Sequence, residues 1–285
     1  MDGRPVGIFD SGMGGVSLLR DALKVLPNEN YIYYGDNLNA PYGDRSEDEI
    51  LELTSNAADF LVEHGVKALV LACNTATSAA INILREKLDV PVISVEPAIK
   101  PACEKQGNGK VFMLATDATT KLSRYRNLLS RMPDPSRVIN VGISGIVSRV
   151  ERGELGIHAY DDIFDKYLSS YHGETADAVV LGCTHYIFIR DAVKAYFKKT
   201  MRGECAVYDG NRATARQLWR VLERENLLNH AGEGRADFFT SGDTAALRPI
   251  FDMLLDTPIA DEPAANSKNC KKSEYALSKR ETEPN

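Results

Sequence analysis

The chain has 285 residues, of which 44% are hydrophobic and 26% are charged, and its formal net charge at pH 7 is −6. This composition is typical of a soluble globular protein with one long or two ordinary domains, and the acidic balance argues against a basic surface that binds nucleic acid. The sequence shows neither a secretory signal nor an apolar run of the roughly 20 residues that span a membrane. We therefore expect a cytoplasmic protein that acts on a small molecule, without membrane or nucleic-acid partners.

Short β-rich runs alternate with helical patterns, which predicts an α/β fold of mostly parallel sheets flanked by helices. We expect strands at residues 6–10, 31–36, 68–74, 90–95, 110–116, 137–142, 178–184 and 205–210. The last four strands repeat the first four. Aligning the strand ends pairs Asp10 with Thr116 or Asp117, Tyr34 with Val141, Cys73 with Cys183, and Val95 with Tyr208. This duplication predicts two similar domains related by a pseudo-twofold axis, with the active site in the cleft between them.

Two segments lie outside the duplication. Residues 211–226 carry apolar side chains at helical spacing, which makes Trp219 a packing residue of a predicted helix. Residues 261–285 are charged and poor in apolar side chains, so we expect a disordered or loosely packed tail in which Cys270 is incidental.

The five cysteines are odd in number and widely spaced, so we expect mostly free thiols and no disulfide framework. No pair has the spacing of a zinc site, and we expect no metal. Cys73 and Cys183 each end an apolar run, in "ALVLACNTAT" and "AVVLGCTHYI", and polar residues follow both. A lone cysteine there would be a packing residue. Two at matching positions, each before a helix start that favours a thiolate, indicate a catalytic pair. Cys103 and Cys205 lack this context and are predicted to be structural.

Two further segments are predicted to face the cleft. In "GIFDSGMGGVSLLRDAL" a glycine-rich turn follows the first strand, but it does not match a dinucleotide-binding loop. Asp10 and Ser11 stand at the strand tip, although Asp10 as a mere helix cap is an alternative. In "NAPYGDRS", Pro41 and Gly43 fix a loop that leaves Tyr42 exposed and its amides open to an anionic ligand.

Four motifs, "DSGMGG", "PYGDRS", "CNTATS" and "GCTHY", occur in the order and at the separations of the glutamate racemases. The chain resembles this family, part of the cofactor-independent aspartate/glutamate racemase superfamily, from about Val6 to Pro258. The Asp-Ser pair after the first strand favours glutamate over aspartate. The family fold implies one domain of residues 1–95 plus 208–260 and a second of residues 96–207. The implied partners are glutamate as substrate and a second copy of the chain in a homodimer, and no cofactor is implied.

The resemblance implies that Cys73 and Cys183 are the two acid/base residues and that Asp10 and His185 are their proton partners. Glu151, in "SRVERGEL", is a further candidate. The residues implied to hold the substrate are Asp10, Ser11, Tyr42, Gly43, Asn74, Thr75, Thr116, Thr184 and His185.

Two thiols suit this chemistry because inversion of an α-carbon removes a proton from one face and returns one to the other. The expected activity is reversible interconversion of L-glutamate and D-glutamate, which supplies D-glutamate for peptidoglycan. Three alternatives stay open: a racemase of aspartate, a cysteine hydrolase or transferase using Cys183 and His185, and a non-catalytic amino-acid-binding or gyrase-interacting protein.

Overall fold

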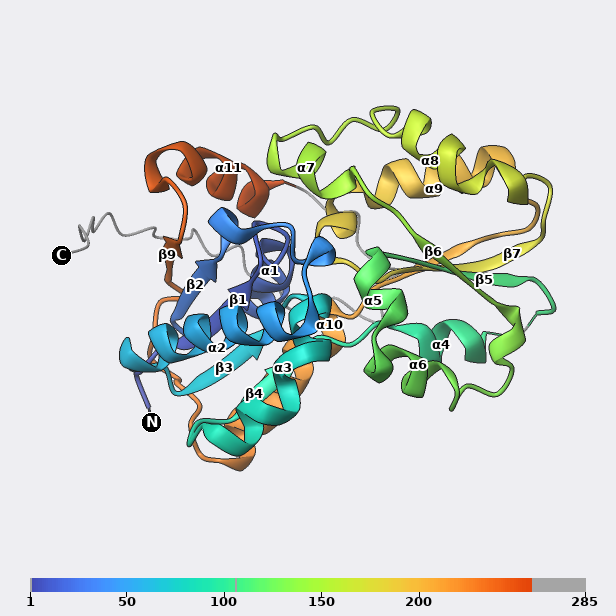
Figure 1. Ribbon diagram of the computed structural model, residues 1–285. Helices are drawn as coiled ribbons and strands as arrows, with labels where there is room; N and C mark the ends of the chain where they lie inside the picture. The colour runs from blue at the N-terminus through green and yellow to red at the C-terminus, as the bar shows by residue number, and fades with distance from the viewer. Residues whose placement is uncertain (1, 106, 258–285) are drawn as a thin grey trace.

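The computed structural model describes residues 2–105 and 107–257, which form two parallel sheets flanked by helices (Figure 1). The first sheet has the order β4-β3-β1-β2-β9. Its strands are β1 (Val6–Asp10), β2 (Tyr31–Gly35), β3 (Ala68–Leu71), β4 (Val92–Ser94) and β9 (Ala236–Thr240). The second sheet has the order β6-β5-β7-β8. Its strands are β5 (Lys110–Ala115), β6 (Val138–Gly142), β7 (Ala176–Leu181) and β8 (Ala206–Tyr208).

The second sheet repeats the topology of the first. Read from its other edge, β8-β7-β5-β6 follows the same path as β4-β3-β1-β2, with every ladder parallel. The predicted α/β fold and its duplication are therefore confirmed, and all eight predicted strands are present. The ninth strand, β9, was not predicted; it extends the first sheet by pairing with β2.

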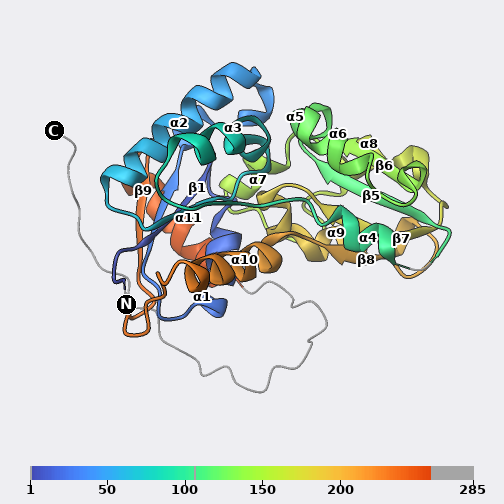
Figure 2. The ribbon, with the colours of Figure 1, turned by 90° about the horizontal axis from the view of Figure 1, so that it is seen from below.

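Helices cover both faces of each sheet. On the first sheet, α2 (Glu47–Glu63) and α3 (Asn74–Lys87) lie on one side, opposite α1 (Val16–Val25), α10 (Asn211–Arg224) and α11 (Thr244–Asp256) (Figure 2). On the second sheet, α4 (Ile99–Glu104) and α6 (Ser123–Leu129) lie opposite α8 (Asp161–Leu168) and α9 (Arg190–Thr200) (Figure 1). The short helices α5 (Asp117–Lys121) and α7 (Ile146–Glu151) are on the side of the second half that meets the first.

Short 3-10 turns complete the described chain. They are η1 (Asn37–Asn39), η2 (Tyr42–Asp44), η3 (Pro135–Arg137), η4 (Ser169–Tyr171) and η5 (Thr184–Ile189). Three of them, η1, η2 and η5, follow strands at the edges where the two halves meet, so they place side chains at the interface.

A single apolar core cluster runs through both halves. It joins Val16, Tyr33 and Phe251 of the first half to Ile146 and Tyr186 of the second, and all five side chains are buried. Because apolar burial stabilises a fold in proportion to the area removed from water, this shared cluster holds the two sheets together beside the cleft.

The segment that leads from α10 to β9 is anchored by a buried ion pair. Lys67 Nζ lies 2.6 Å from Glu29 Oε2, and both side chains are fully buried. The ammonium also donates to the carbonyl oxygens of Asp2 and Leu227, each at 2.7 Å, so two backbone acceptors hold it beside the carboxylate. Glu29 Oε1 accepts from the amide of Asn229 at 2.8 Å.

Outside the duplication, one predicted helix is present, but one of its side chains does not lie where it was predicted. The predicted helix at 211–226 is α10, but Trp219 is 39% exposed and is not a packing residue. It follows the buried Leu218 directly, and one residue turns a helix by about 100°, which carries its side chain away from α1. The predicted tail, with Cys270 and residues 258–260 of the expected first domain, lies outside the described residues.

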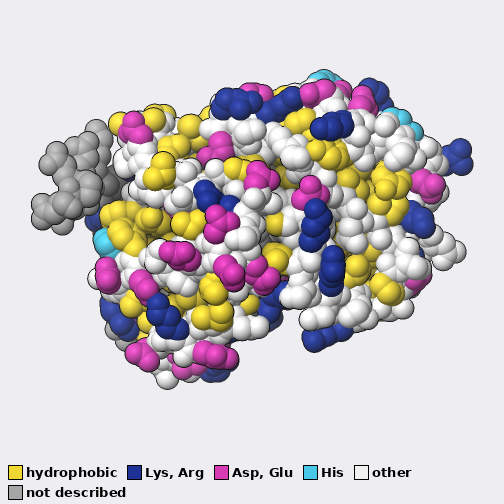
Figure 3. Space-filling model, in the orientation of Figure 1, with side chains coloured by type: hydrophobic (Ala, Val, Ile, Leu, Met, Phe, Trp, Pro, Cys, Tyr) yellow, Lys and Arg dark blue, Asp and Glu magenta, His cyan; other side chains and the backbone are white. Residues whose placement is uncertain are grey.

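The face of the molecule shown in Figure 3 has no patch of one charge sign. On the side shown in Figure 3, basic and acidic side chains are scattered over both halves. Among the described helices, none has the length and apolar character needed to cross a bilayer.

Candidate active site

The carboxyl ends of four strands meet at one cavity between the two halves. β1 and β3 contribute Ser11 and Cys73, and β5 and β7 contribute Thr116 and Cys183. The cavity has a volume of about 20 Å³, which is room for about one water molecule. Its lining comprises Ser11, Pro41, Tyr42, Gly43, Cys73, Asn74, Thr75, Thr116, Thr119, Val147, Gly182, Cys183, Thr184 and His185.

Cys73 stands at the N-terminus of α3. Its Sγ accepts from the amide of Ala76 at 3.4 Å and lies 3.3 Å from Ser11 Oγ. Burial raises the pKa of the Cys73 thiol to about 12, and the negative charge of Asp10 adds to the rise. The two hydrogen bonds offset part of it. At neutral pH Cys73 is therefore a thiol in the ligand-free protein.

Cys183 stands at the equivalent strand end but contacts a different partner. Its Sγ lies 3.8 Å from Nδ1 of His185, and Nε2 of His185 lies 2.7 Å from Glu151 Oε1. Burial alone lowers the pKa of His185, but its contacts with Cys183 and Glu151 hold it well above the usual value. Burial opposes ionisation of Glu151, yet the hydrogen bond from His185 keeps its pKa low. The second sulfur thus lies beside a positively charged imidazolium, whereas the sulfur of Cys73 lies near a buried carboxylate.

Asp10 lies behind the cavity rather than on its lining. Its carboxylate is fully buried and accepts from the amide of Gly12 at 3.0 Å and from Thr184 Oγ1 at 3.1 Å. Burial raises the pKa of Asp10, and His185 with these two hydrogen bonds offsets only part of the rise. The alternative of a helix cap does not hold, because α1 begins at Val16 and has no side-chain cap.

The glycines of the first turn allow the two halves to approach. A Cβ on Gly14 would overlap Nδ1 of His185 and Oγ1 of Thr184, and one on Gly12 would overlap Oε1 of Glu151. The turn therefore packs its backbone directly against the "GCTHY" segment of the second half. This close approach is a use of glycine that needs no phosphate ligand.

The loop that carries Tyr42 is packed down rather than exposed. Tyr42 is only 1% exposed, so the prediction of an exposed side chain is wrong. Its ring lies 6.3 Å from that of Phe9, and its hydroxyl donates to Asp36 Oδ2 at 2.6 Å. Asp36 is buried and also accepts from Ser241 Oγ and Asn39 Nδ2. Tyr42 thus lines the cavity as a buried side chain that Asp36 holds in place.

Three threonine hydroxyls join the two halves at the cavity. Oγ1 of Thr75 on α3 lies 3.2 Å from Thr116 and 3.1 Å from Thr119, and the last two are 2.9 Å apart. Thr116 also caps α5 by accepting from the amide of Thr119. Each hydroxyl can donate once and accept from another, so the three form a closed ring beside the thiols.

The family assignment follows from comparison with known proteins. Residues 16–218 match the family model described as Asp/Glu/Hydantoin racemase. The chain belongs to this racemase family. A glutamate racemase of Clostridium botulinum is 41% identical over 240 residues, which is 84% of this chain and 91% of the relative.

Solved structures of racemases agree with this assignment. The glutamate racemase of Thermus thermophilus, in complex with β-chloro-D-alanine, superposes with a TM-score of 0.75 at 34% identity, covering 89% of this chain and 94% of that one. The glutamate racemase of Francisella tularensis, in complex with D-glutamate, gives a TM-score of 0.77 at 28% identity, covering 91% and 96%.

Three residues near the racemase cavity were not predicted from the sequence: Thr119 lines the cavity, whereas Asp36 and Asn37 are outside its lining and hydrogen-bond to Tyr42 and Glu151. Asp36 and Asn37 follow β2, and Thr119 lies in the first turn of α5. Their positions at the carboxyl ends of strands were a usable signal. The four cysteines of the described ranges are free thiols, and Cys103 and Cys205 are outside the lining.

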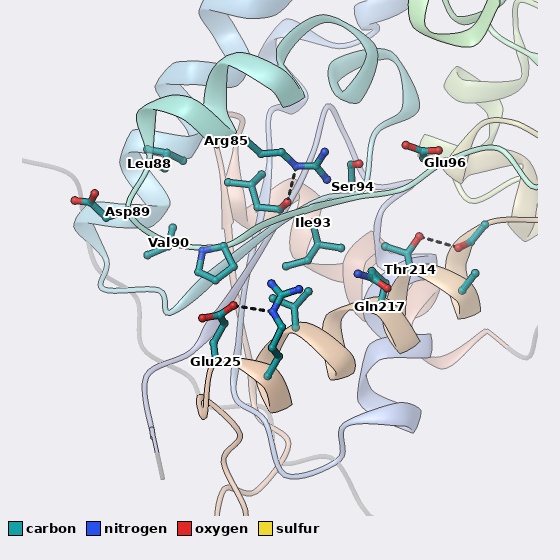
Figure 4. A pocket seen from close by; sticks show the side chains of 16 residues that line it. Arg85, Leu88, Asp89, Val90, Ile93, Ser94, Glu96, Thr214, Gln217 and Glu225 are labelled. Atoms are coloured by element: carbon teal, nitrogen blue, oxygen red, sulfur yellow. Dashed lines mark hydrogen bonds and ion pairs between the residues drawn. The ribbon is translucent and has the colours of Figure 1, made fainter. Parts of the chain in front are cut away.

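A larger hollow of about 680 Å³ lies away from the thiols, between the end of α3, the edge strand β4, and α10 (Figure 4). Arg85 from α3 faces it on one side of β4, and Gln217 from α10 and Glu225, directly after α10, face it on the other. Its lining contains neither a cysteine nor a histidine. We therefore locate the acid/base chemistry at the smaller cavity.

Proposed function

We propose that the protein interconverts L-glutamate and D-glutamate reversibly, with Cys73 and Cys183 as the two acid/base groups. The proposal rests on one observation. Equivalent strand ends in the two repeated halves each place a thiol at the same cavity. A single base would return the proton to the face it came from, whereas two groups on opposite faces achieve inversion.

The two sulfur environments support complementary roles. For the L form, Cys183 as a thiolate beside the His185 imidazolium takes the α-proton, and the Cys73 thiol gives its proton to the opposite face. The electron pair of the broken C–H bond forms the new one, and the product is D-glutamate with Cys73 as thiolate. For the D form the same steps run in reverse. Backbone dipoles at the helix starts stabilise the negative charge that develops on the substrate.

Substrate recognition is proposed for the polar groups of the lining. Asn74 Oδ1 is buried and has no hydrogen-bond partner, which makes it an acceptor for the ammonium of an amino acid. The first amides of α3, at Asn74 and Thr75, have no partner within the helix and suit a carboxylate. Ser11, Thr116 and Thr184 add hydroxyls, and Tyr42 and Gly43 close the site from the loop.

The test is incubation of L-glutamate with pure protein in heavy water, with optical rotation and α-deuteration followed together. The proposal expects rotation to decay to zero while deuterium enters the α-position and no glutamate is consumed. Binding of glutamate without α-proton exchange would instead indicate a pure binding protein. Aspartate racemised faster than glutamate would indicate the aspartate alternative.

A cysteine hydrolase or transferase would use Cys183, His185 and Glu151, whose contacts resemble a nucleophile with its base and orienting acid. This alternative leaves Cys73 without a role in a cavity that it lines. A burst of acyl product would support it, and enantiomer interconversion without consumption would exclude it.

The wider role follows from the same proposal. D-glutamate supply for peptidoglycan is the role that the family implies, and the cytoplasm is the compartment that we propose for it. No added pyridoxal phosphate, nucleotide or metal should be required, so dialysis against a chelator should leave activity unchanged. A homodimer is the assembly that we propose, and sedimentation equilibrium measures it.

A further inference from the structure

The Glu151 carboxylate, which contacts His185, also accepts hydrogen bonds from residues that are distant in sequence. Glu151 Oε1 accepts from Nε2 of His185 and from the amide of Met13, each at 2.7 Å. Its other oxygen, Oε2, accepts from Asn37 Nδ2 at 2.9 Å. The Glu151 side chain is 18% exposed, so these contacts act where water screens them little.

The amide of Asn37 is oriented by β9. Asn37 Oδ1 accepts from Thr240 Oγ1 at 2.9 Å, and Thr240 Oγ1 accepts from the amide of Gly242 at 3.0 Å. A carboxylate can only accept and a backbone amide can only donate. The direction of every hydrogen bond from Gly242 to Glu151 is therefore fixed, and Asn37 must present its NH₂ group to the carboxylate.

This chain of contacts reaches one thiol and not the other. It runs from the end of β9 through Asn37 and Glu151 to His185, whose Nδ1 lies beside Cys183 Sγ. The Cys73 sulfur instead contacts Ser11 and the amide of Ala76, and neither group belongs to the chain of contacts.

We propose that Asn37 is a positioning residue for Cys183: by fixing Glu151 it keeps Nε2 of His185 donating and Nδ1 facing the sulfur. The inference rests on the proposed racemase function and adds to it. It gives β9, the strand outside the duplication, a role in proton transfer at Cys183 but not at Cys73.

The test uses half-site variants, in which one thiol is removed and the other is left as the only base. A glutamate analogue with a leaving group on its β-carbon loses its α-proton and the leaving group together, and the resulting enamine hydrolyses to 2-oxoglutarate. Asn37→Ala in the Cys73→Ala background should slow this elimination by about ten-fold to a hundred-fold, because a hydrogen bond to a charged group is lost. In the Cys183→Ala background the same change should have little effect.

Two variants sharpen the test. Asn37→Asp keeps the size of the side chain but cannot donate to Glu151 at neutral pH, and it should slow the same half-reaction at least as much. Leu38→Ala removes a neighbouring side chain that is 73% exposed, and it should change neither half-reaction. Equal slowing of both half-reactions by Asn37→Ala would reduce Asn37 to a general structural role, and no slowing of either would overturn the proposal.

A measurement independent of turnover separates this proposal from the function on which it rests. Nitrogen NMR of His185 follows its protonation in the ligand-free protein, where Glu151, Cys183 and Asp10 are the titratable groups around it. Asn37→Ala should shift the titration of His185 to lower pH, because Glu151 is held less firmly. An unchanged titration would contradict the positioning role even if racemisation were confirmed, and failure of racemisation in the parent protein would leave this readout intact.

Discussion

Cys73 and Cys183 occupy equivalent positions in the duplicated fold, but their sulfurs have opposite surroundings. Cys73 contacts a hydroxyl and a helix amide near the buried carboxylate of Asp10. Cys183 contacts His185, which Glu151 keeps protonated. The two sulfurs therefore differ in the charge that lies beside them, a buried carboxylate near Cys73 and an imidazolium near Cys183. A two-base inversion needs one acid and one base at the start of each turnover, and unlike surroundings can distinguish the two.

The pH dependence of Cys73 alkylation tests this asymmetry. Because the pKa of Cys73 is raised to about 12, its reactive thiolate is scarce at neutral pH and grows ten-fold with each pH unit. We predict that the rate of iodoacetamide modification, followed for the Cys73 peptide by mass spectrometry, still rises at pH 10. An ordinary thiol levels off above its pKa of about 8.5. A plateau near that value for Cys73 would show that burial and Asp10 do not suppress ionisation.

At the residue scale, the sequence identified groups at strand ends better than the groups that support them. Cys73, Thr116 and Cys183 each follow an apolar run, so their convergence could be predicted from the parallel topology. Asn37 contacts Glu151 and Thr240, which are distant in sequence, and its place after β2 does not reveal those partners.

At the scale of elements, the turn between β1 and α1 decides how closely the halves meet. Gly14→Ala should reduce racemisation by more than about ten-fold, because its Cβ would displace His185 and Thr184 from their positions. Gly3→Ala is the matched control, since a Cβ there would contact nothing within 4 Å. The measurement is kcat/KM for both glutamate enantiomers, with circular dichroism to confirm folding. Near-parent activity of Gly14→Ala would mean that the turn can move away from His185 and Thr184 without disturbing the site.

Elements with strong local patterns were predicted well, and those fixed by distant contacts were not. The eight strands of the duplication lie in apolar runs, whereas β9 (Ala236–Thr240) interrupts its apolar residues with Asp237 and forms by pairing with β2. Periodicity predicted α10 but placed Trp219 on its buried face, because the limits of an apolar stripe depend on the neighbouring helix. Tyr42 was expected to be exposed for a similar reason: a turn motif does not reveal what the turn folds onto.

At the scale of the whole molecule, we propose that residues 1–95 and 208–260 form one domain and residues 96–207 the other. The pairing of β9 with β2 and the packing of α10 against α1 support this division. Native-state hydrogen exchange should then show amides of β9 and α10 opening together with β1 and β2. Opening of β9 together with the second sheet would require different boundaries.

The size of the cavity has a consequence for turnover. About 20 Å³ accommodates a single water molecule, so we expect the two halves or the Tyr42 loop to move apart when glutamate binds. Closure around the substrate would then exclude water from the sulfurs and strengthen their electrostatic interactions.

The central claim is that one thiol serves each face of the substrate, and elimination by single-thiol variants tests it most directly. Cys73→Ala and Cys183→Ala should both lose racemisation. With a β-leaving-group analogue of glutamate, Cys73→Ala should eliminate only from the L form and Cys183→Ala only from the D form. Cys103→Ala and Cys205→Ala, which alter thiols outside the cavity, should keep both activities. Racemisation at near the parent rate by either single-thiol variant, or elimination by both from the same enantiomer, would contradict the account.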